Sequence, residues 1–390
     1  MVRKSLILIA AGLFLTMATA VWAQSGAIGS AHHSYRVVTV AEGLEIPWSI
    51  TFLPDGDMLV TERPGRLRSI RDGVLLPDSV PGVPEVHAEG QGGLFDVLPH
   101  PEFTSNRLLY LAYAHPNSGG STTRVVRARF ENDQLSGLEE IFLAVSQGRG
   151  HYGGKLAFDR NGLLFLSVGE RQASASGDLE THPAQDVSNH HGTIIRLHDD
   201  GRIPVDNPFV EQSEAGTDVR PEIWSYGHRN PQGLVIHPDT NDVWITEHGP
   251  QGGDELNRIE PGLNYGWPVI GYGVNYRTGL AIHEGTMRED MEHPDYFWVP
   301  SIAASGLMIY RGDRFPQWQG NMFSGGLAGQ QLARLTLSED AQRIEQEETL
   351  MQGIGRIRDV REGPDGYIYV AIEGRDGALT PIVRLEPADQ

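Results

Sequence analysis

The segment from Trp224 to Pro268 carries more reactive polar side chains than a scaffold of strands and turns requires. It contains the run His228-Arg229-Asn230, then Glu247-His248-Gly249-Pro250, and then the acidic pair Asp254-Glu255. Strands need alternating apolar residues and turns need Gly, Pro or Asn, but neither needs this combination. The excess polarity indicates a functional site.

Oxygen-bearing groups in the second half of this segment suit calcium. Residues 248–255 lack the spacing of an EF-hand. They still offer carbonyl groups from the Gly249-Pro250 turn and carboxylates from Asp254 and Glu255, which are the ligand types that Ca²⁺ prefers. Zinc is the weaker alternative, because the chain has no cysteine and no HExxH motif.

Two arginines near the C-terminal end could bind carboxylates. Arg356 and Arg358 are two positions apart, so in an extended segment their side chains point the same way. With Arg229 they could clamp a cofactor that has several carboxylates, because guanidinium groups pair bidentately with planar anions. Salt bridges to Asp359, to Glu362 or to acids at the ends of other strands are the alternative.

His151 is the candidate general base. It lies in the glycine-rich stretch 147–154, directly before a predicted strand, and glycines let other groups approach closely. A loop imidazole whose pKa lies near the operating pH can accept a proton. A second stretch, Gln91-Gly92-Gly93, also joins a polar side chain to glycine-rich backbone.

A recurring pattern predicts the elements that position these residues. An apolar residue, a turn of Pro, Asp, Asn or Gly and a short β-prone strand recur, with strand onsets near residues 58, 108, 163, 243, 322 and 367. Four short strands fit into each interval, and radial repetition of four-stranded sheets makes a β-propeller. We therefore predict an all-β fold, a six-bladed β-propeller of four-stranded antiparallel blades, with seven or eight blades as the alternative.

Several of the repeated strands end in an acid. These acids are Glu62, Glu170, Glu247 and Glu373. In a propeller, residues just beyond equivalent strand ends converge around the central channel, although they are distant in sequence. Capping of turns by the carboxylates is the competing interpretation.

The N-terminal segment has the features of a secretory signal peptide. A basic start is followed by an apolar run, Leu6 to Met17, that is shorter than the ~20 residues a membrane span needs. We expect cleavage after residue 23 and export to the periplasm without stable membrane insertion; a retained anchor is the alternative. Residues 24–35 are predicted as a linker and residues 36–390 as one catalytic propeller domain.

Composition excludes several function classes. The absence of cysteine argues against thiol catalysis, iron–sulfur clusters and Cys-ligated metals. The formal net charge of -20 disfavours a nucleic-acid or anionic-membrane partner. A solvated acidic surface accounts for most of this charge.

Together these motifs resemble the soluble, pyrroloquinoline quinone (PQQ)-dependent glucose/sorbosone dehydrogenase family, and most closely its aldose sugar dehydrogenase branch. The resemblance runs from about Val38 to Leu385. Its most specific parts are residues 227–233, 247–255, 264–268 and 356–360. It implies a six-bladed propeller that oxidises the anomeric C1 hydroxyl of aldoses to lactones by hydride transfer to PQQ. It also implies an external electron acceptor, and we expect a monomer or a homodimer.

The resemblance also implies roles for individual residues. His151 matches the general base that removes the proton of the anomeric hydroxyl. The positions that match cofactor contacts are Gln91, Arg229, Asn230, Tyr276, Arg356 and Arg358.

Two calcium sites are implied as well. The backbone carbonyls of Gly249 and Pro250 match ligands of a calcium that touches the quinone. Glu255, the carbonyl of Tyr265 and Asp254 resemble a second, structural calcium site.

Three positions depart from the family pattern. Residues 326–331 lack a lysine that the family carries near the quinone, Glu170 is one methylene longer than the usual acid beside the base, and His248 replaces a glutamine. Two other readings therefore stay open. One is a non-enzymatic propeller that binds sugars or a protein, and the other is a calcium-dependent lactonase.

Overall fold

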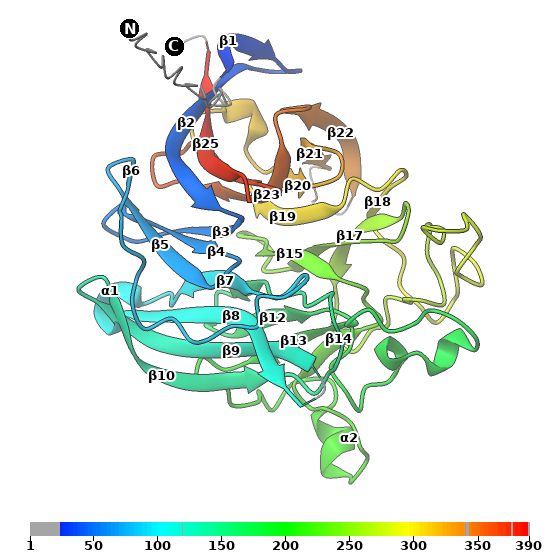
Figure 1. The fold of residues 1–390 in the computed structure, drawn as a ribbon. Helices are drawn as coiled ribbons and strands as arrows, with labels where there is room; N and C mark the ends of the chain where they lie inside the picture. Colours follow the sequence, from blue (N-terminus) through cyan, green and yellow to red (C-terminus); the bar gives the residue numbers. More distant parts are fainter. Residues whose placement is uncertain (1–23, 119, 339, 341–342, 376, 389–390) are drawn as a thin grey trace, which may run out of the picture.

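The computed structural model of the protein describes residues 24–390, apart from residues 119, 339, 341–342, 376 and 389–390. Within these residues the strands form six antiparallel sheets, arranged as blades around a common axis (Figure 1). The predicted six-bladed, all-β propeller is therefore confirmed. The predicted signal peptide, residues 1–23, lies outside the described residues.

Five blades of the described chain contain four strands each, in sequence order. The strands of the first two blades are β3 (Pro47–Phe52), β4 (Met58–Glu62), β5 (Arg66–Arg71), β6 (Val74–Leu75), β7 (Leu94–Pro99), β8 (Leu108–Asn117), β9 (Gly120–Glu131) and β10 (Gln134–Leu143). The strands of the next three are β11 (Leu156–Phe158), β12 (Leu164–Val168), β13 (Thr193–Leu197), β14 (Ile223–Tyr226), β15 (Pro231–Ile236), β16 (Val243–Glu247), β17 (Asp254–Ile259), β18 (Tyr296–Trp298), β19 (Ala304–Ile309), β20 (Met322–Gly326), β21 (Gln331–Leu337) and β22 (Ile344–Leu350).

The sixth blade joins the two ends of the described chain. Its strands are β23 (Arg356–Glu362), β24 (Ile368–Glu373), β25 (Leu379–Pro387), β2 (Ser34–Glu45) and β1 (Gln24–Gly29). The N-terminal β2 pairs antiparallel with the C-terminal β25, so this pairing closes the ring (Figure 1, blue beside red). Residues 24–35, which we predicted as a linker, contain β1 and the start of β2.

The recurring sequence pattern corresponds to the second strand of each blade. The strands that begin at the predicted onsets are β4, β8, β12, β16, β20 and β24. In β4, β12, β16, β20 and β24 every residue is buried. A second strand lies inside its own sheet and between two neighbouring blades, so both of its faces are covered and its sequence is a short continuous apolar run.

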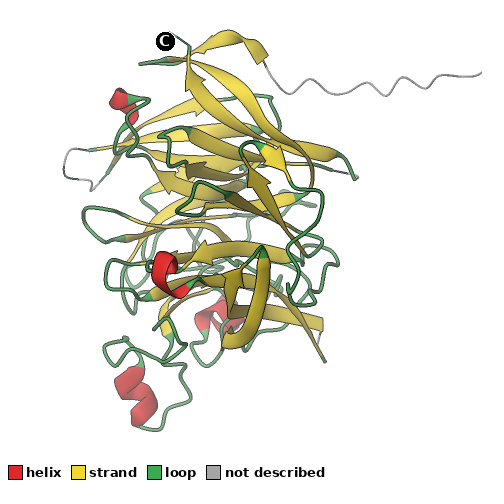
Figure 2. Cartoon of the chain, turned by 90° about the vertical axis from the view of Figure 1, so that its left-hand side faces the viewer, coloured by secondary structure: helices red, strands yellow, loops and turns green. Residues whose placement is uncertain are grey.

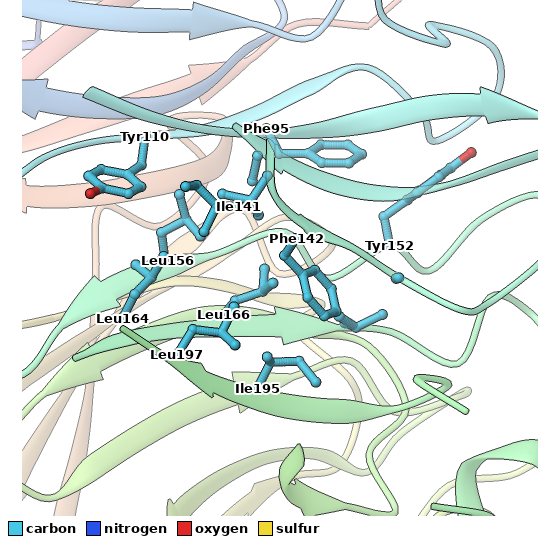
Figure 3. Packing of buried hydrophobic residues seen from close by; sticks show 14 of the residues in the cluster. Phe95, Tyr110, Ile141, Phe142, Tyr152, Leu156, Leu164, Leu166, Ile195 and Leu197 are labelled. Atoms are coloured by element: carbon cyan, nitrogen blue, oxygen red, sulfur yellow. The ribbon is translucent and has the colours of Figure 1, made fainter. Parts of the chain in front are cut away.

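Apolar side chains hold neighbouring blades together. Figure 3 shows such a cluster between the second and third blades, where Phe95 and Phe142 pack with Leu166 and Ile195. Burial of this kind stabilises a fold by roughly 25 cal/mol per Å² of apolar surface. The ring is therefore held by packing between blades and by the β2–β25 pairing, in a chain without cysteine.

Helices contribute little to the described chain. Its helical elements are α1 (Phe103–Asn106), α2 (Val210–Glu214) and the 3-10 turns Leu179–Thr181, Pro183–Gln185 and Pro316–Trp318. They lie in connections outside the sheets (Figure 2). None of the described helices has the length and apolar character needed to cross a membrane.

Candidate functional site

The predicted site residues lie at one end of the central channel, which we call the mouth. The first strands of the blades, β3, β7, β11, β15, β19 and β23, contact one another in a closed ring. Gln91, His151 and Asn230 come shortly before first strands of three blades, and Arg356 opens the first strand of a fourth. Because equivalent strand starts lie at the same end of the ring, the fold brings these residues together.

His151 forms a buried pair with Glu170. The Nδ1 atom of His151 is hydrogen-bonded to one carboxylate oxygen of Glu170, and the other oxygen accepts a bond of 2.6 Å from the backbone N–H of Ala173. Burial and the positive charge of Arg229 lower the pKa of His151. Although burial opposes ionisation, the hydrogen bond and charge of His151 lower the pKa of Glu170. The arrangement favours a neutral imidazole that is oriented by an ionised carboxylate.

The loop that carries His151 is held by Gln91 and Arg171. His151 has a positive φ of 42°, and its backbone N–H donates to the side-chain oxygen of Gln91 at 2.8 Å. The buried guanidinium of Arg171 donates to the carbonyl of Gly148 at 3.0 Å and lies 3.5 Å from the centre of the Tyr152 ring. This role of Arg171 could not be predicted, because no local sequence pattern shows which loop its side chain reaches.

Arg229 and Asn230 connect the loop of His151 to residues 248–255, the segment whose oxygen groups suit calcium. The Nη1 atom of Arg229 donates to the carbonyls of His248 and Gly249 at 2.8 and 2.6 Å. The side-chain oxygen of Asn230 accepts from the backbone N–H of Gly153 at 3.2 Å. The Asn230 bond ties the fourth blade to the His151 loop of the third, and the Arg229 bonds reach the Gly249 turn, so the segments 147–154 and 224–268 form one site.

Arg356 and Arg358 both bind Glu373. Arg356 bonds to Oε1 of Glu373 through Nε and Nη2 at 3.1 and 2.8 Å. Arg358 bonds to Oε2 through Nε at 2.7 Å and through Nη2. Despite the opposing effect of burial, the charges of Arg358 and Arg356 lower the pKa of Glu373 to about 2. The two arginines therefore lie side by side, as predicted, and their partner in this structure is an acid at the end of a strand.

A small cavity behind Gly249 is lined by two carboxylates. Glu247 and Glu255 border it together with Gly249, Pro250 and Tyr265. Its volume of about 10 Å³ has room for one water-sized sphere. Burial and then the charge of Glu247 raise the pKa of Glu255 well above its usual range. A bound cation would offset this excess of negative charge.

The donor set of this cavity fits calcium better than zinc. The described residues contain no group of three or more His, Cys, Asp and Glu side chains that could hold a metal ion. A cation here would therefore depend on backbone carbonyls, which are ligands of calcium rather than of zinc.

Asp254, which we predicted as a calcium ligand, has three protein donors at its carboxylate. Its carboxylate accepts bonds from Gly249 N at 2.9 Å, from Ser301 Oγ at 2.7 Å and from Ala304 N at 3.0 Å. A buried carboxylate that is bonded in this way has its oxygens directed at protein donors. We therefore assign Asp254 to holding the backbone of Gly249 in place.

Tyr276, a predicted cofactor contact, lies at the rim of the mouth. Its side chain is exposed, and its hydroxyl is 3.4 Å from the carbonyl of Gly249.

Glu247 is a further site residue whose detailed role the sequence did not reveal. It accepts from the backbone N–H of Arg229 at 2.6 Å and from the buried ring of His228 at 3.0 Å. Its position as an acid at a strand end was the signal that could have located it.

The fold and the site define a class, the six-bladed β-propellers with a polar binding site at the mouth of the channel. A family model described as glucose/sorbosone dehydrogenase matches residues 44–381. The aldose sugar dehydrogenase YliI of Escherichia coli is 38% identical over 367 residues, which cover 92% of this chain and 95% of the relative. The chain therefore belongs to the glucose/sorbosone dehydrogenase family.

Solved structures support the same relationship. A crystal structure of a glucose dehydrogenase superposes with a TM-score of 0.82 at 43% sequence identity and covers 90% of this chain and 99% of its own. The PQQ-bound form of an aldose sugar dehydrogenase from Streptomyces coelicolor superposes with a TM-score of 0.72 at 27% identity, with coverage of 90% and 97%.

Proposed function

We propose that the protein is a PQQ-dependent aldose sugar dehydrogenase that oxidises the C1 hydroxyl of aldoses to lactones. The observation that carries this proposal is the His151–Glu170 pair at the same mouth as Arg229, Arg356 and Arg358. A base and a group of anion-binding residues are what C1 oxidation with an anionic quinone requires. The relatives named as aldose sugar dehydrogenases support the same reaction.

The residues at the mouth fit a quinone that carries several carboxylates. The Nε of Arg229 and the Nε2 of His248 are buried without a hydrogen-bond partner among the described residues. Such atoms cost free energy unless a bound polar molecule satisfies them. We assign cofactor binding to Gln91, Arg229, Asn230, Tyr276, Arg356 and Arg358. Bound PQQ supplies the acceptor for the two electrons that leave C1 as hydride.

His151 is proposed to accept the proton of the anomeric hydroxyl at Nε2. Its Nδ1 is engaged by Glu170, which fixes the tautomer and leaves Nε2 as the ring atom available to substrate. The lowered pKa keeps the imidazole neutral at neutral pH. As the proton arrives, the ionised Glu170 stabilises the imidazolium that forms.

Calcium is proposed to bind through the carbonyls of Gly249 and Pro250, and a second calcium through Glu255 and the carbonyl of Tyr265. At the first position the ion would act as a Lewis acid toward the quinone. Arg229 donates to the Gly249 carbonyl at 2.6 Å, and two cations repel each other at one oxygen. We therefore expect the guanidinium of Arg229 to turn away from Gly249 when calcium binds there.

We further propose that residues 1–23 direct export to the periplasm and that an external acceptor takes the electrons. The basic start, the short apolar run and the small residues before Gln24 support export.

The decisive experiment reconstitutes the purified protein with PQQ and Ca²⁺, adds an aldose, and follows reduction of an artificial electron-acceptor dye. We expect dye reduction that depends on the sugar, on PQQ and on Ca²⁺. No reduction with any aldose, accompanied by lactone hydrolysis or by sugar binding without turnover, would replace this proposal by the lactonase or the binding propeller.

A further inference from the structure

Arg63 lies at the mouth directly after β4, in a position that its backbone fixes. Its N–H donates to the carbonyl of Ile46 at 3.0 Å, and its carbonyl accepts from Leu94 at 3.0 Å. A Cβ atom placed on Gly93 would lie 2.5 Å from the Arg63 Cγ, so the absence of a side chain at residue 93 leaves room for the Arg63 stem. The side chain is thus held between the first and second blades, beside the loop of Gln91.

The guanidinium of Arg63 has charged neighbours but no partner. It is partly buried, and it forms no hydrogen bond or ion pair with any residue that the structure describes. Its charged neighbours are Glu373, Arg358 and Arg356. Burial lowers the pKa of Arg63, and repulsion from Arg358 and Arg356 adds to this effect against the attraction of Glu373.

Glu373 has no capacity left for a third guanidinium. A carboxylate offers about four lone-pair directions. Arg356 fills two of them at Oε1, and Arg358 fills two at Oε2. Arg63 therefore has no hydrogen-bonded counterion, because the carboxylate of Glu373 near it is already bonded by Arg356 and Arg358.

The mouth carries more positive charge than the carboxylates around it neutralise. Four guanidinium groups, those of Arg63, Arg229, Arg356 and Arg358, outnumber the carboxylates of Glu373 and Glu170 that lie among them, so this cluster has an excess of positive charge. The whole chain has a net charge of -20, so the cluster is a local exception. Concentrated positive charge that the protein does not neutralise is a binding site for a multiply charged anion.

We propose that Arg63 is a further cofactor-binding residue, whose guanidinium binds a carboxylate of the quinone from the blade opposite to Arg229. This inference rests on the proposed function. It adds the first blade to the site, and it supplies a cation at a mouth whose stretch 326–331 contains no lysine.

The test is the dissociation constant of PQQ, measured by isothermal titration calorimetry on the Ca²⁺-loaded, cofactor-free full chain. A hydrogen bond to a charged group corresponds to about a tenfold to hundredfold change in affinity. We expect the dissociation constant to rise about tenfold or more for Arg63→Gln and to recover in part for Arg63→Lys. The wild-type constant is also expected to rise more steeply with salt than that of Arg63→Gln.

The matched control is Arg202→Gln, which removes the same charge from an exposed side chain in the connection between β13 and β14, paired with Asp200. Its PQQ affinity should equal that of the wild type, and thermal unfolding of all variants checks the fold. Wild-type affinity in a folded Arg63→Gln would overturn the role of Arg63 alone. Failure of the wild type to bind PQQ would instead overturn the proposed function.

Discussion

Replacement of Glu170 by glutamine tests how the base is held and charged. Glutamine keeps the length of the side chain but removes the negative charge that faces Nδ1 of His151. A hydrogen bond to a charged group contributes about 1.5–3 kcal/mol. At 1.36 kcal/mol for each factor of ten in rate, kcat/KM should fall about 10- to 150-fold.

The pH profile separates this role from a merely structural one. Burial and Arg229 lower the pKa of His151, whereas Glu170 raises it. Loss of the carboxylate charge should therefore lower this pKa further. The base must be neutral to act, so kcat/KM is lost as pH falls through the pKa, and in Glu170→Gln the acidic limb should move to lower pH. The assay is initial-rate dye reduction with glucose, saturating PQQ and Ca²⁺, over a series of pH values.

The control for this prediction is Glu139→Gln on β10, where the carboxylate is half exposed and pairs with Arg127 at 2.8 Å. It should leave both the rate and the pH profile unchanged. If Glu170→Gln retained kcat/KM within about twofold and showed an unmoved acidic limb, the His151–Glu170 pair would not be the catalytic base.

Three further outcomes are expected. His151→Ala should abolish dye reduction while calorimetry still detects PQQ binding; near wild-type turnover would refute its role as base. Lys155→Met should lower the free energy of unfolding in urea by about 3–5 kcal/mol, because it leaves buried carboxylates without their cation. The Nζ atom of Lys155 lies 2.9 Å from Asp359 and 3.5 Å from Asp96. An unchanged free energy of unfolding would refute this pairing. Folding raises the pKa of Glu255. As pH rises above the pKa that Glu255 has in the unfolded chain, its ionisation therefore lowers the free energy of unfolding. At neutral pH in chelator, Glu255→Gln should therefore raise Tm and abolish the Tm increase on Ca²⁺ addition, and a retained Ca²⁺ response would exclude Glu255 as a ligand.

Much of the fold could be predicted from the sequence, because each blade repeats one local signal. The second strands are buried on both faces, so they appear as short apolar runs after turn residues, as in Met58–Glu62 and Ile368–Glu373. The outer strands are partly exposed and irregular, as in Gln134–Leu143, and carry no comparable pattern. The pairing of β2 with β25 was not predicted, because it joins segments at opposite ends of the chain.

The residue types of the site could be predicted, but their partners could not. Arg356 and Arg358 were expected to act together, and the structure shows that Glu373 binds both. Arg63 was missed because it follows a strand as one charged residue among many, and only ring closure places it beside the sixth blade. The donors that surround Asp254 could not be predicted, because its position beside Glu255 in the sequence does not reveal them.

The acids at the strand ends show how the repeat produces the site. Glu62 accepts from the backbone N–H of Glu45 at 2.6 Å, just before the first strand of its own blade. Glu247 does the same for Arg229, and in the ladders Glu62 lies opposite Pro47 as Glu247 lies opposite Pro231. One blade position thus brings a carboxylate to the entry of the first strand.

What this carboxylate does depends on the residue that it meets there. In the first blade Glu62 holds backbone and also pairs with Arg66 and Arg68. In the sixth blade the acid lies one position further along the second strand, where Glu373 binds Arg356 and Arg358. In the third blade Glu170 lies two residues beyond the end of β12, and there it meets the imidazole of His151. Capping thus describes Glu62 and Glu247, whose carboxylates accept backbone N–H groups, and site formation stays a prediction for Glu170 and Glu373. Because blades of one ring place these entries at the same mouth, local capping contacts repeated around the ring are sufficient to assemble a site from distant segments.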